Sequence, residues 1–279
     1  MSDEKLLNIA LESAKKAGVE VMKYYRDKSF TAELKEDESP VTSADIAANN
    51  VLMDCLQTLT PDIPIISEEV GALPLAQRQN WSKYWLLDPI DGTGEFIIGS
   101  GDFAVNIALV ENGWPSIGVI HAPDHHLTYY AQNHLGAFKE CALNKYNHSH
   151  SQQIHVAEYH QQRPIKVAIS KRQRIDLMGQ YLNDEFNFDH VALGSCSLKN
   201  CLIAEGGADC YLRVGVTGEW DTGASQCILE QAGGTILDSE FKPLSYNKRE
   251  SLLNPDFVSL GNQNIPWKQV IIAHRKVYA

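Results

Sequence analysis

Three features are missing from this sequence, and each absence excludes a class of protein. No stretch approaches the ~20 consecutive apolar residues that a membrane-spanning helix needs. The six cysteines are scattered, without a C-x-x-C pair or the histidine spacing of a zinc site, so we interpret them as reduced thiols. No run of Lys and Arg is dense enough to follow a nucleic-acid backbone, and the formal net charge is −11. We therefore expect no integral membrane segment, no disulfide framework and no nucleic acid as partner.

The composition that remains is that of an ordinary globular enzyme. The chain has 279 residues, of which 44% are hydrophobic and 21% charged, a size at which one core usually divides into two lobes. Residues 1–16 lack the apolar segment of a signal peptide, so we expect a cytoplasmic protein. An acidic protein that acts on a polyanionic substrate would need metal ions to reverse its local field.

Hydrophobic periodicity predicts a first lobe, residues 1–145, of helices on a sheet. Leu6, Ala10, Ala14, Ala17 and Val21 form one apolar stripe on a helix that reaches about Tyr25. A turn and N-cap over 39–43 precede a second helix over 44–59, with Asp45 in its first turn and a predicted stripe of Ile46, Asn50, Met53 and Leu56. The predicted strands of this lobe are 63–66, 84–87, 103–110, 116–121, 127–131 and 136–139.

A polar stretch, residues 144–162, is predicted to separate this lobe from a second, α/β lobe over residues 146–279. We interpret His148, His150 and His155 in this stretch as solvated loop residues and not as metal ligands. Beyond it, strands and helices alternate over 165–169, 198–205, 210–214 and 222–232.

Carboxylates gather at the ends of the predicted elements. Glu68 and Glu69 follow one buried strand, Asp88 and Asp91 follow the next, and Asp221 stands at a helix start. Carboxylates that share a cleft repel one another unless cations bind, and hard oxygen ligands suit magnesium or manganese better than zinc. The segment D-P-I-D-G is also good turn chemistry, so by itself it supports a turn equally well.

The same segments resemble a known family. I-S-E-E at 66–69, D-P-I-D-G-T at 88–93 and E-W-D-T-G-A-S at 219–225 are similar to the motifs of the inositol monophosphatase superfamily, which are lithium-sensitive, magnesium-dependent phosphatases. The likeness extends from S-P-V-T-S-A-D at 39–45 to E-S-L-L-N-P at 250–255. It implies an α/β/α/β/α sandwich of the sugar-phosphatase type.

Matching positions imply the roles of particular residues. The implied ligands of two or three Mg²⁺ ions, for which Mn²⁺ can substitute, are Glu68, Asp88, the carbonyl of Ile90, Asp91 and Asp221. Thr93, hydrogen-bonded to Asp45, would prepare the attacking water together with Glu68. The implied substrate contacts are Glu68, Ile90, Asp91, Gly92, Thr93, Ser197, Lys199 and Asp221.

Lys199 and its neighbours allow two interpretations by pattern alone. The resemblance brings Lys199 toward a 5'-phosphate, whereas a lysine at a helix start is as often a solvated surface residue. Two segments also depart from the pattern. Gly94 stands where the nucleotidases of this superfamily usually carry lysine, and Ser195-Cys196-Ser197 replaces a glycine-serine-serine form. The first departure removes a cation beside the phosphate site.

Within the superfamily, the sequence is most similar to bacterial 3'(2'),5'-bisphosphate nucleotidases. This implies hydrolysis of adenosine 3',5'-bisphosphate to AMP and phosphate by metal-activated water, with 3'-phosphoadenylyl sulfate as a further substrate, in sulfur metabolism. The resemblance also allows a monomer or homodimer and peripheral association with the cytoplasmic face of the inner membrane. The alternatives are an inositol monophosphatase or broad sugar phosphatase, against which Glu95 argues, and a non-catalytic regulatory relative.

Overall fold

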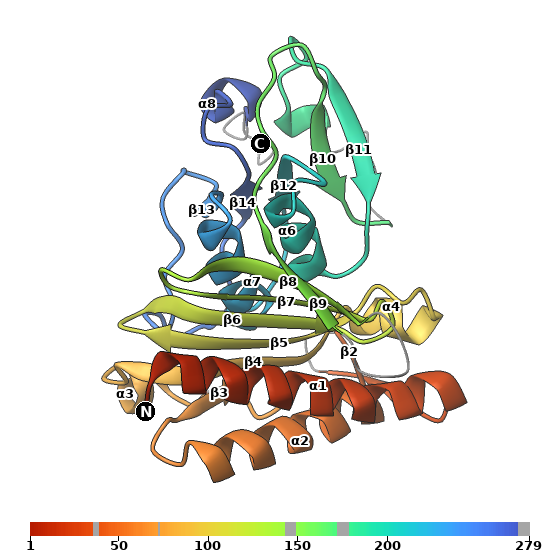
Figure 1. Ribbon diagram of the computed structural model, residues 1–279, viewed down its shortest axis with the longest axis vertical. Helices are drawn as coiled ribbons and strands as arrows, with labels where there is room; N and C mark the ends of the chain where they lie inside the picture. The colour runs from red at the N-terminus through yellow and green to blue at the C-terminus, as the bar shows by residue number, and fades with distance from the viewer. Residues whose placement is uncertain (36–38, 72, 143–148, 172–178, 273–279) are drawn as a thin grey trace.

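The chain folds into stacked layers of helices and sheets. The computed structural model describes residues 1–35, 39–71, 73–142, 149–171 and 179–272. Helices α1 (Asp3–Asp27) and α2 (Ser43–Leu59) cover one face of a seven-stranded sheet, and α6 (Cys196–Ala204) and α7 (Glu219–Gln231) separate its other face from a five-stranded sheet (Figure 1). The short helix α8 (Trp267–Val270) packs on the second sheet. This is the α/β/α/β/α order that the sequence predicts.

The first sheet contains every strand predicted for the first lobe, and one more. Its order follows the chain: β3 (Ile65–Ser67), β4 (Lys83–Asp91), β5 (Ala104–Glu111), β6 (Trp114–Ala122), β7 (Leu127–Gln132), β8 (Gly136–Ala142) and β9 (Ser149–Ile154). Strands β3 and β4 are parallel, and all later neighbours pair antiparallel.

The additional strand β9 corrects our interpretation of the polar stretch 144–162. Residues 149–154 pair with β8 as the last strand of the first sheet, so His150 lies in a strand and not in a loop. The mostly polar sequence of β9 gives no alternating pattern, and the strand is held by backbone pairing with β8 and by the burial of Ile154 in the core. His148 and the predicted boundary at residue 145 lie outside the described residues.

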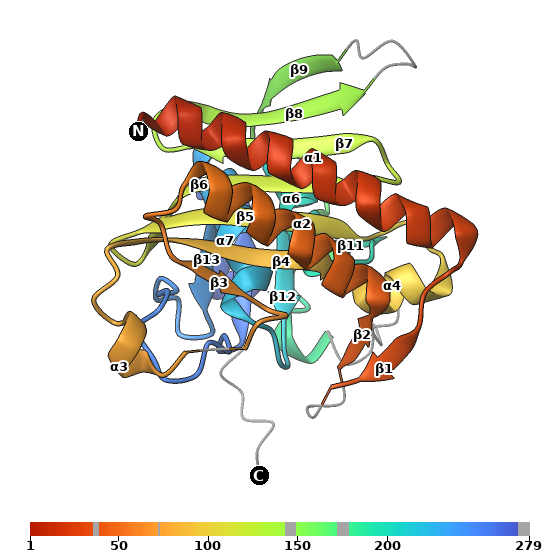
Figure 2. The same cartoon turned by 90° about the horizontal axis from the view of Figure 1, so that it is seen from below.

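Helices α1 and α2 run side by side across the sheet (Figure 2). Ser2 caps α1, and every residue of the predicted apolar stripe of this helix is buried. Thr42 caps α2 in a capping box with Asp45. The predicted stripe of α2 was wrong at two positions, because Ile46 and Asn50 are exposed. The buried face consists of Ala44, Ala48, Leu52 and Leu56, spaced by four, where small alanines let the two helices approach closely.

The second sheet has the order β11-β10-β12-β14-β13. Strands β10 (Ile165–Ile169), β11 (Phe188–Ala192) and β12 (Cys210–Arg213) are parallel, whereas β14 (Phe257–Leu260) runs antiparallel to both of its neighbours, β12 and β13 (Thr235–Asp238). The predicted elements β10, α6, β12 and α7 are confirmed. Short connecting elements complete the described chain: β1 (Ala32–Leu34), β2 (Pro40–Thr42), α3 (Leu75–Arg78), α4 (Thr93–Ile98) and η1 (Gly179–Tyr181).

Helix α7 lies at the centre of the molecule and belongs to a core shared by both sheets. Its Ala224 and Ile228 join one buried cluster with Leu86 of the first sheet and Phe257 of the second. A Cβ atom at Gly118 of β6 would lie 2.3 Å from the carbonyl oxygen of Ala224, so only glycine permits this contact. The two sheets are therefore faces of one continuous core.

Two expectations drawn from absences can be compared with the structure. All six cysteines lie in the described part of the chain and are free thiols, four of them buried. No helix among the described residues is long and apolar enough to cross a membrane.

Candidate active site

The parallel strands β3 and β4 bring their acidic ends to the same edge of the first sheet. The backbone N–H of Glu68 donates to the carbonyl of Leu87, 3.2 Å away, which ties the two strand ends together. Strand β4 was predicted to end at Leu87, but it continues to Asp91, with a register shift against β5 between Asp88 and Asp91. Pro89 has no N–H to donate, so the ladder is interrupted where the two carboxylates emerge.

Three of the predicted ligands form one tight cluster. One carboxylate oxygen each of Asp88, Asp91 and Asp221 lies within 4.8 Å of the others. Asp221 reaches this cluster from the first turn of α7, where its Oδ2 accepts the Gly218 N–H at 2.6 Å. Burial and then the neighbouring carboxylates raise the pKa of Asp88 and of Asp221 well above the usual range.

The donor set of this cluster fits a divalent cation. Asp88 is 1% exposed, and its Oδ1 has no hydrogen-bond partner among the described residues. A buried carboxylate oxygen without a partner is costly, and several such carboxylates side by side are stabilised when a hard cation binds between them. Asp88, Asp91 and Asp221 are therefore the residues that would hold it.

Glu68 lines the same cleft but stands outside the tight cluster. Its Oε1 accepts from Lys35 Nζ at 2.8 Å, and Glu69 accepts from the same ammonium group at 2.8 Å. Although burial opposes ionisation of Lys35, these two carboxylates raise its pKa. Lys35 follows β1 and was not singled out in the sequence, because its chain neighbours Glu33, Glu36, Asp37 and Glu38 are themselves acidic and nothing there indicates a pairing with Glu68 and Glu69.

The predicted hydrogen bond between Thr93 and Asp45 is present. Thr93 Oγ1 lies 3.1 Å from Asp45 Oδ1 and 3.1 Å from the carbonyl oxygen of Ile90. The other oxygen of Asp45 accepts from the N–H and the hydroxyl of Thr42, at 2.8 and 2.6 Å. The capping box of α2 therefore orients the carboxylate that meets Thr93, and Gly92, with φ of +95°, begins the turn into α4.

The N-terminus of α6 holds Asp91. The N–H groups of Cys196 and Ser197 donate to its two oxygens at 3.1 and 2.7 Å, and the hydroxyls of Ser195 and Ser197 each donate to Oδ2 at 2.5 Å. Ser197 is fully buried, lines neither cleft described below and contacts Asp91; its contact with substrate stays a prediction. Ser195 was not predicted as a site residue.

Two adjoining clefts meet at the carboxylate cluster. The acidic cleft, about 200 Å³, is lined by Glu68, Asp88, Ile90, Thr93 and neighbouring residues. The basic cleft, named for Lys199 and Arg213, is about 360 Å³ and is also lined by Glu95, Ser170 and Tyr211, among others. Asp91, Gly92 and Asp221 line both clefts.

The alternative of a solvated surface position for Lys199 is wrong, because this lysine is buried in the wall of the basic cleft. Lys199 is 2% exposed; its Nζ donates to the carbonyls of Leu193 and Ser195 and lies 4.9 Å from the centroid of the Tyr211 ring. Burial lowers the pKa of Lys199. Arg213 is a second cation that the sequence pattern did not single out, and its Nε is buried without a hydrogen-bond partner among the described residues.

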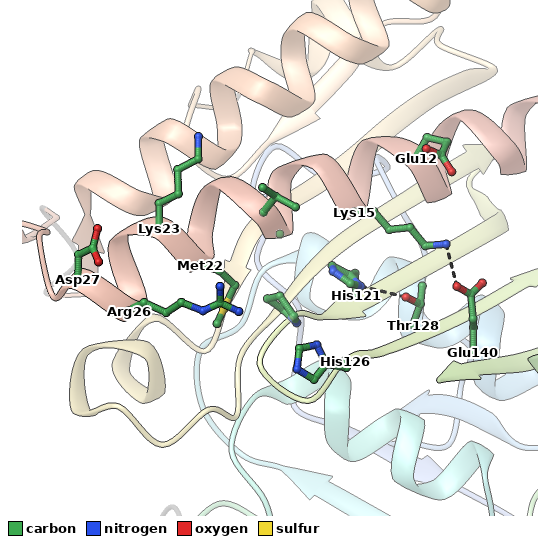
Figure 3. A pocket seen from close by; sticks show the side chains of 13 residues that line it. Glu12, Lys15, Met22, Lys23, Arg26, Asp27, His121, His126, Thr128 and Glu140 are labelled. Atoms are coloured by element: carbon green, nitrogen blue, oxygen red, sulfur yellow. Dashed lines mark hydrogen bonds and ion pairs between the residues drawn. The ribbon is translucent and has the colours of Figure 1, made fainter. Parts of the chain in front are cut away.

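A cavity larger than either cleft lies elsewhere, between α1 and the strands β6 to β8 (Figure 3). It measures about 780 Å³, and its walls include Lys15, His121, Thr128 and Glu140. Lys15 pairs with Glu140 at 2.9 Å, and His121 contacts the hydroxyl of Thr128 at 2.9 Å. None of the clustered carboxylates lines this cavity, so its size alone does not make it the reactive centre.

The chemistry of the two clefts defines the class of protein. Buried carboxylates that repel one another bind hard cations, and a cation-loaded cleft beside Lys199 and Arg213 suits a substrate with more than one anionic group. In a layered α/β sandwich, this site is that of a metal-dependent phosphatase.

Comparison with known proteins agrees and gives the family. A model of the inositol monophosphatase family matches residues 2–273. The 3'(2'),5'-bisphosphate nucleotidase CysQ of Aggregatibacter actinomycetemcomitans is 41% identical over 95% of this chain and 96% of its own, and that of Escherichia coli K12 is 42% identical over 90% and 98%. The crystal structure of CysQ from Bacteroides thetaiotaomicron superposes with a TM-score of 0.80 at 32% identity, covering 94% of this chain and 98% of that one. The chain belongs to the inositol monophosphatase family, whose members are metal-dependent.

Proposed function

We propose that the protein is a magnesium-dependent 3'(2'),5'-bisphosphate nucleotidase that hydrolyses adenosine 3',5'-bisphosphate to AMP and phosphate in the cytoplasm. The relatives that carry this name match nearly the whole chain at 38–43% identity. A nucleotide of this kind carries two phosphate groups on one ribose, so it needs two neighbouring anion sites.

The pair of adjoining clefts is the observation that carries the proposal. The acidic cleft would receive the 3'-phosphate beside the cation ligands, and the basic cleft would receive the 5'-phosphate beside Arg213 and Lys199. The buried Nε of Arg213 offers a hydrogen-bond donor that lacks an acceptor in the described chain. An inositol monophosphate would leave this donor unused.

The proposed roles in catalysis combine the contacts of each residue with its position in the family's motifs. Glu68, Asp88, the Ile90 carbonyl, Asp91 and Asp221 would hold Mg²⁺ ions, which neutralise the phosphate and acidify water in enzymes of this class. Thr93, fixed by Asp45, would orient the attacking water, and the Asp45 carboxylate would take up its proton through Thr93. The N–H groups of Gly92 and Thr93, at the turn into α4, would hold the phosphate oxygens.

A substrate panel tests the proposed activity. Phosphate release by the purified protein with Mg²⁺ should be compared for adenosine 3',5'-bisphosphate, inositol 1-phosphate and fructose 1,6-bisphosphate. We expect the highest kcat/KM for the nucleotide. Preference for inositol 1-phosphate would assign the chain to the inositol enzymes, and no turnover of any of the three would favour a non-catalytic relative.

The basic cleft can be tested separately with a substrate that lacks the second phosphate. Arg213→Met should raise KM for adenosine 3',5'-bisphosphate about tenfold or more, because a charge-assisted contact to phosphate is lost, and should leave turnover of adenosine 3'-monophosphate near its wild-type value. Equal effects on both substrates would contradict a role for Arg213 at the 5'-phosphate.

The carboxylate cluster is tested by Asp88→Asn. This change keeps the shape of the side chain and removes one ligand charge, so we expect loss of activity by a factor of 10² or more with a folded protein. Asp62→Asn, at an exposed acid remote from both clefts, is the matched control and should retain activity. An active Asp88→Asn protein would refute the assignment of the cluster.

A further inference from the structure

Ser195 has a backbone conformation that is unusual for a residue with a side chain. Its φ is +53° and its ψ is 142°, next to a region that glycine alone occupies without strain. The residue lies between β11 and α6 and is only 6% exposed. Such strain persists only where surrounding contacts hold it, and it is often found at functional sites.

Contacts on both sides of Ser195 hold this conformation. Before it, the N–H of Gly194 donates to Asp102 Oδ2 at 2.7 Å. Behind it, Lys199 Nζ donates to the carbonyl of Ser195, and the Ser195 hydroxyl oxygen accepts the N–H of Leu198 at 3.1 Å.

Asp102 is itself firmly placed. It is 3% exposed and accepts from Lys171 Nζ at 2.6 Å and from His125 Nε2 at 3.1 Å. Although burial opposes its ionisation, these donors and the Gly194 N–H hold the pKa of Asp102 below the usual range. A carboxylate from the first lobe thus fixes the backbone that leads into α6.

The strained geometry directs the Ser195 hydroxyl to Asp91. Its Oγ donates to Asp91 Oδ2 at 2.5 Å, and Oδ2 also accepts the N–H and hydroxyl of Ser197. From the described residues, Asp91 Oδ1 accepts a single and longer bond, from the Cys196 N–H at 3.1 Å. The hydrogen bonds are therefore concentrated on one oxygen, which fixes the rotation of the carboxylate and leaves the other with free lone pairs.

We propose that Ser195 is a positioning residue, which orients Asp91 for cation binding at the expense of local backbone strain. The proposal rests on the proposed function only in assuming that Asp91 is a cation ligand. Outer contacts of this kind change metal affinity because they orient the ligand that touches the ion. With glycine at this position, the backbone would be relaxed and the hydroxyl contact to Asp91 absent.

Two substitutions at Ser195 distinguish the effect of its hydroxyl group from the effect of its backbone strain. Ser195→Ala removes the hydroxyl and keeps the Cβ atom in the strained conformation, whereas Ser195→Gly removes both. We expect isothermal titration with Mn²⁺ to show affinity weaker by about tenfold in both variants. The Tm of Ser195→Gly should exceed that of Ser195→Ala by roughly 3 °C, because the strain is relieved only in the former.

The two measurements distinguish positioning from a merely structural role. If Ser195 only shaped the local fold, the Mn²⁺ affinity of each variant would change in parallel with its Tm, and the glycine variant would bind Mn²⁺ as well as wild type does. That result would overturn the proposal. Unchanged affinity in both variants would overturn it as well. Should the alanine variant fail to fold, the glycine variant still decides between wild-type and weakened affinity. A wild-type protein that binds no Mn²⁺ would instead overturn the proposed function.

Discussion

His121 should make the stability of this protein sensitive to mild acid. The ring lies beneath α1, where a Cβ atom on Gly18 would come within 2.4 Å of its Cδ2, and it contacts the Thr128 hydroxyl (Figure 3). Burial, reinforced by the nearby Lys15 ammonium, lowers the pKa of His121 from 6.5 to about 4, with the neighbouring His126 acting in the same direction and Glu140 opposing. The native state therefore keeps this ring neutral where the unfolded chain protonates it.

The sign and the size of the effect follow from these two pKa values. Between pH 6.5 and pH 4, the unfolded state binds a proton that the native state does not, so stability falls as the pH is lowered. From pH 7 to pH 5, the contribution of this one group amounts to about 2 kcal/mol, since each pKa unit corresponds to ~1.4 kcal/mol.

Urea unfolding at pH 7 and pH 5 provides the assay. His121→Asn retains a polar group near Thr128 and does not titrate, so its stability should fall by about 2 kcal/mol less than that of wild type over this interval. The control is His190→Asn, at an exposed position on β11, which should keep the wild-type dependence. Parallel pH profiles for wild type and His121→Asn would refute the reasoning.

Two further substitutions test contacts that hold the layers together. Gly118→Ala places a Cβ atom against the Ala224 carbonyl, so thermal unfolding should show a free energy of unfolding lower by about 2 kcal/mol. The affinity for Mn²⁺ should also fall, because the displaced helix α7 carries Asp221. An unchanged Tm would mean that α7 can shift freely. Asp102→Ala should cost about 2 kcal/mol in urea unfolding by leaving the buried Gly194 N–H unpaired. Lys171→Met should cost less than about 1 kcal/mol, because that lysine side chain is 41% exposed, and equal losses for the two variants would contradict this account.

Regular apolar patterns account for the elements that the sequence predicts well. The stripe of α1 and the apolar runs of the strands β4 to β7 show such patterns, and Pro89 and Gly92 mark the turn beside Asp88 and Asp91, although β4 itself continues past Leu87 to Asp91. Strands β9, β11, β13 and β14 are short or polar. Strand β9 pairs with the preceding strand β8, and β14 pairs with β12 and β13, and no local pattern reveals these pairings.

The surface alternative for Lys199 failed for the same physical reason. Lys199 stands at the start of a helix, where a local pattern allows a solvated side chain. This helix start is tied through Ser197 to Asp91, 106 residues away along the chain, and through Gly194 to Asp102. The acidic motifs were easier to recognise, because several carboxylates at strand ends carry a chemical meaning before their three-dimensional partners are known.

The central position of α7 has a consequence for biosynthesis. The first sheet is complete at Ile154, yet the apolar face that includes Leu86 and Ala108 is covered by residues of α7 and of β14, which leave the ribosome much later. At cellular elongation rates, this face would stay uncovered for roughly ten seconds. A nascent chain that stalls in this interval presents a sheet surface suited to chaperone binding, and the helix that delivers Asp221 is the one that ends the exposure.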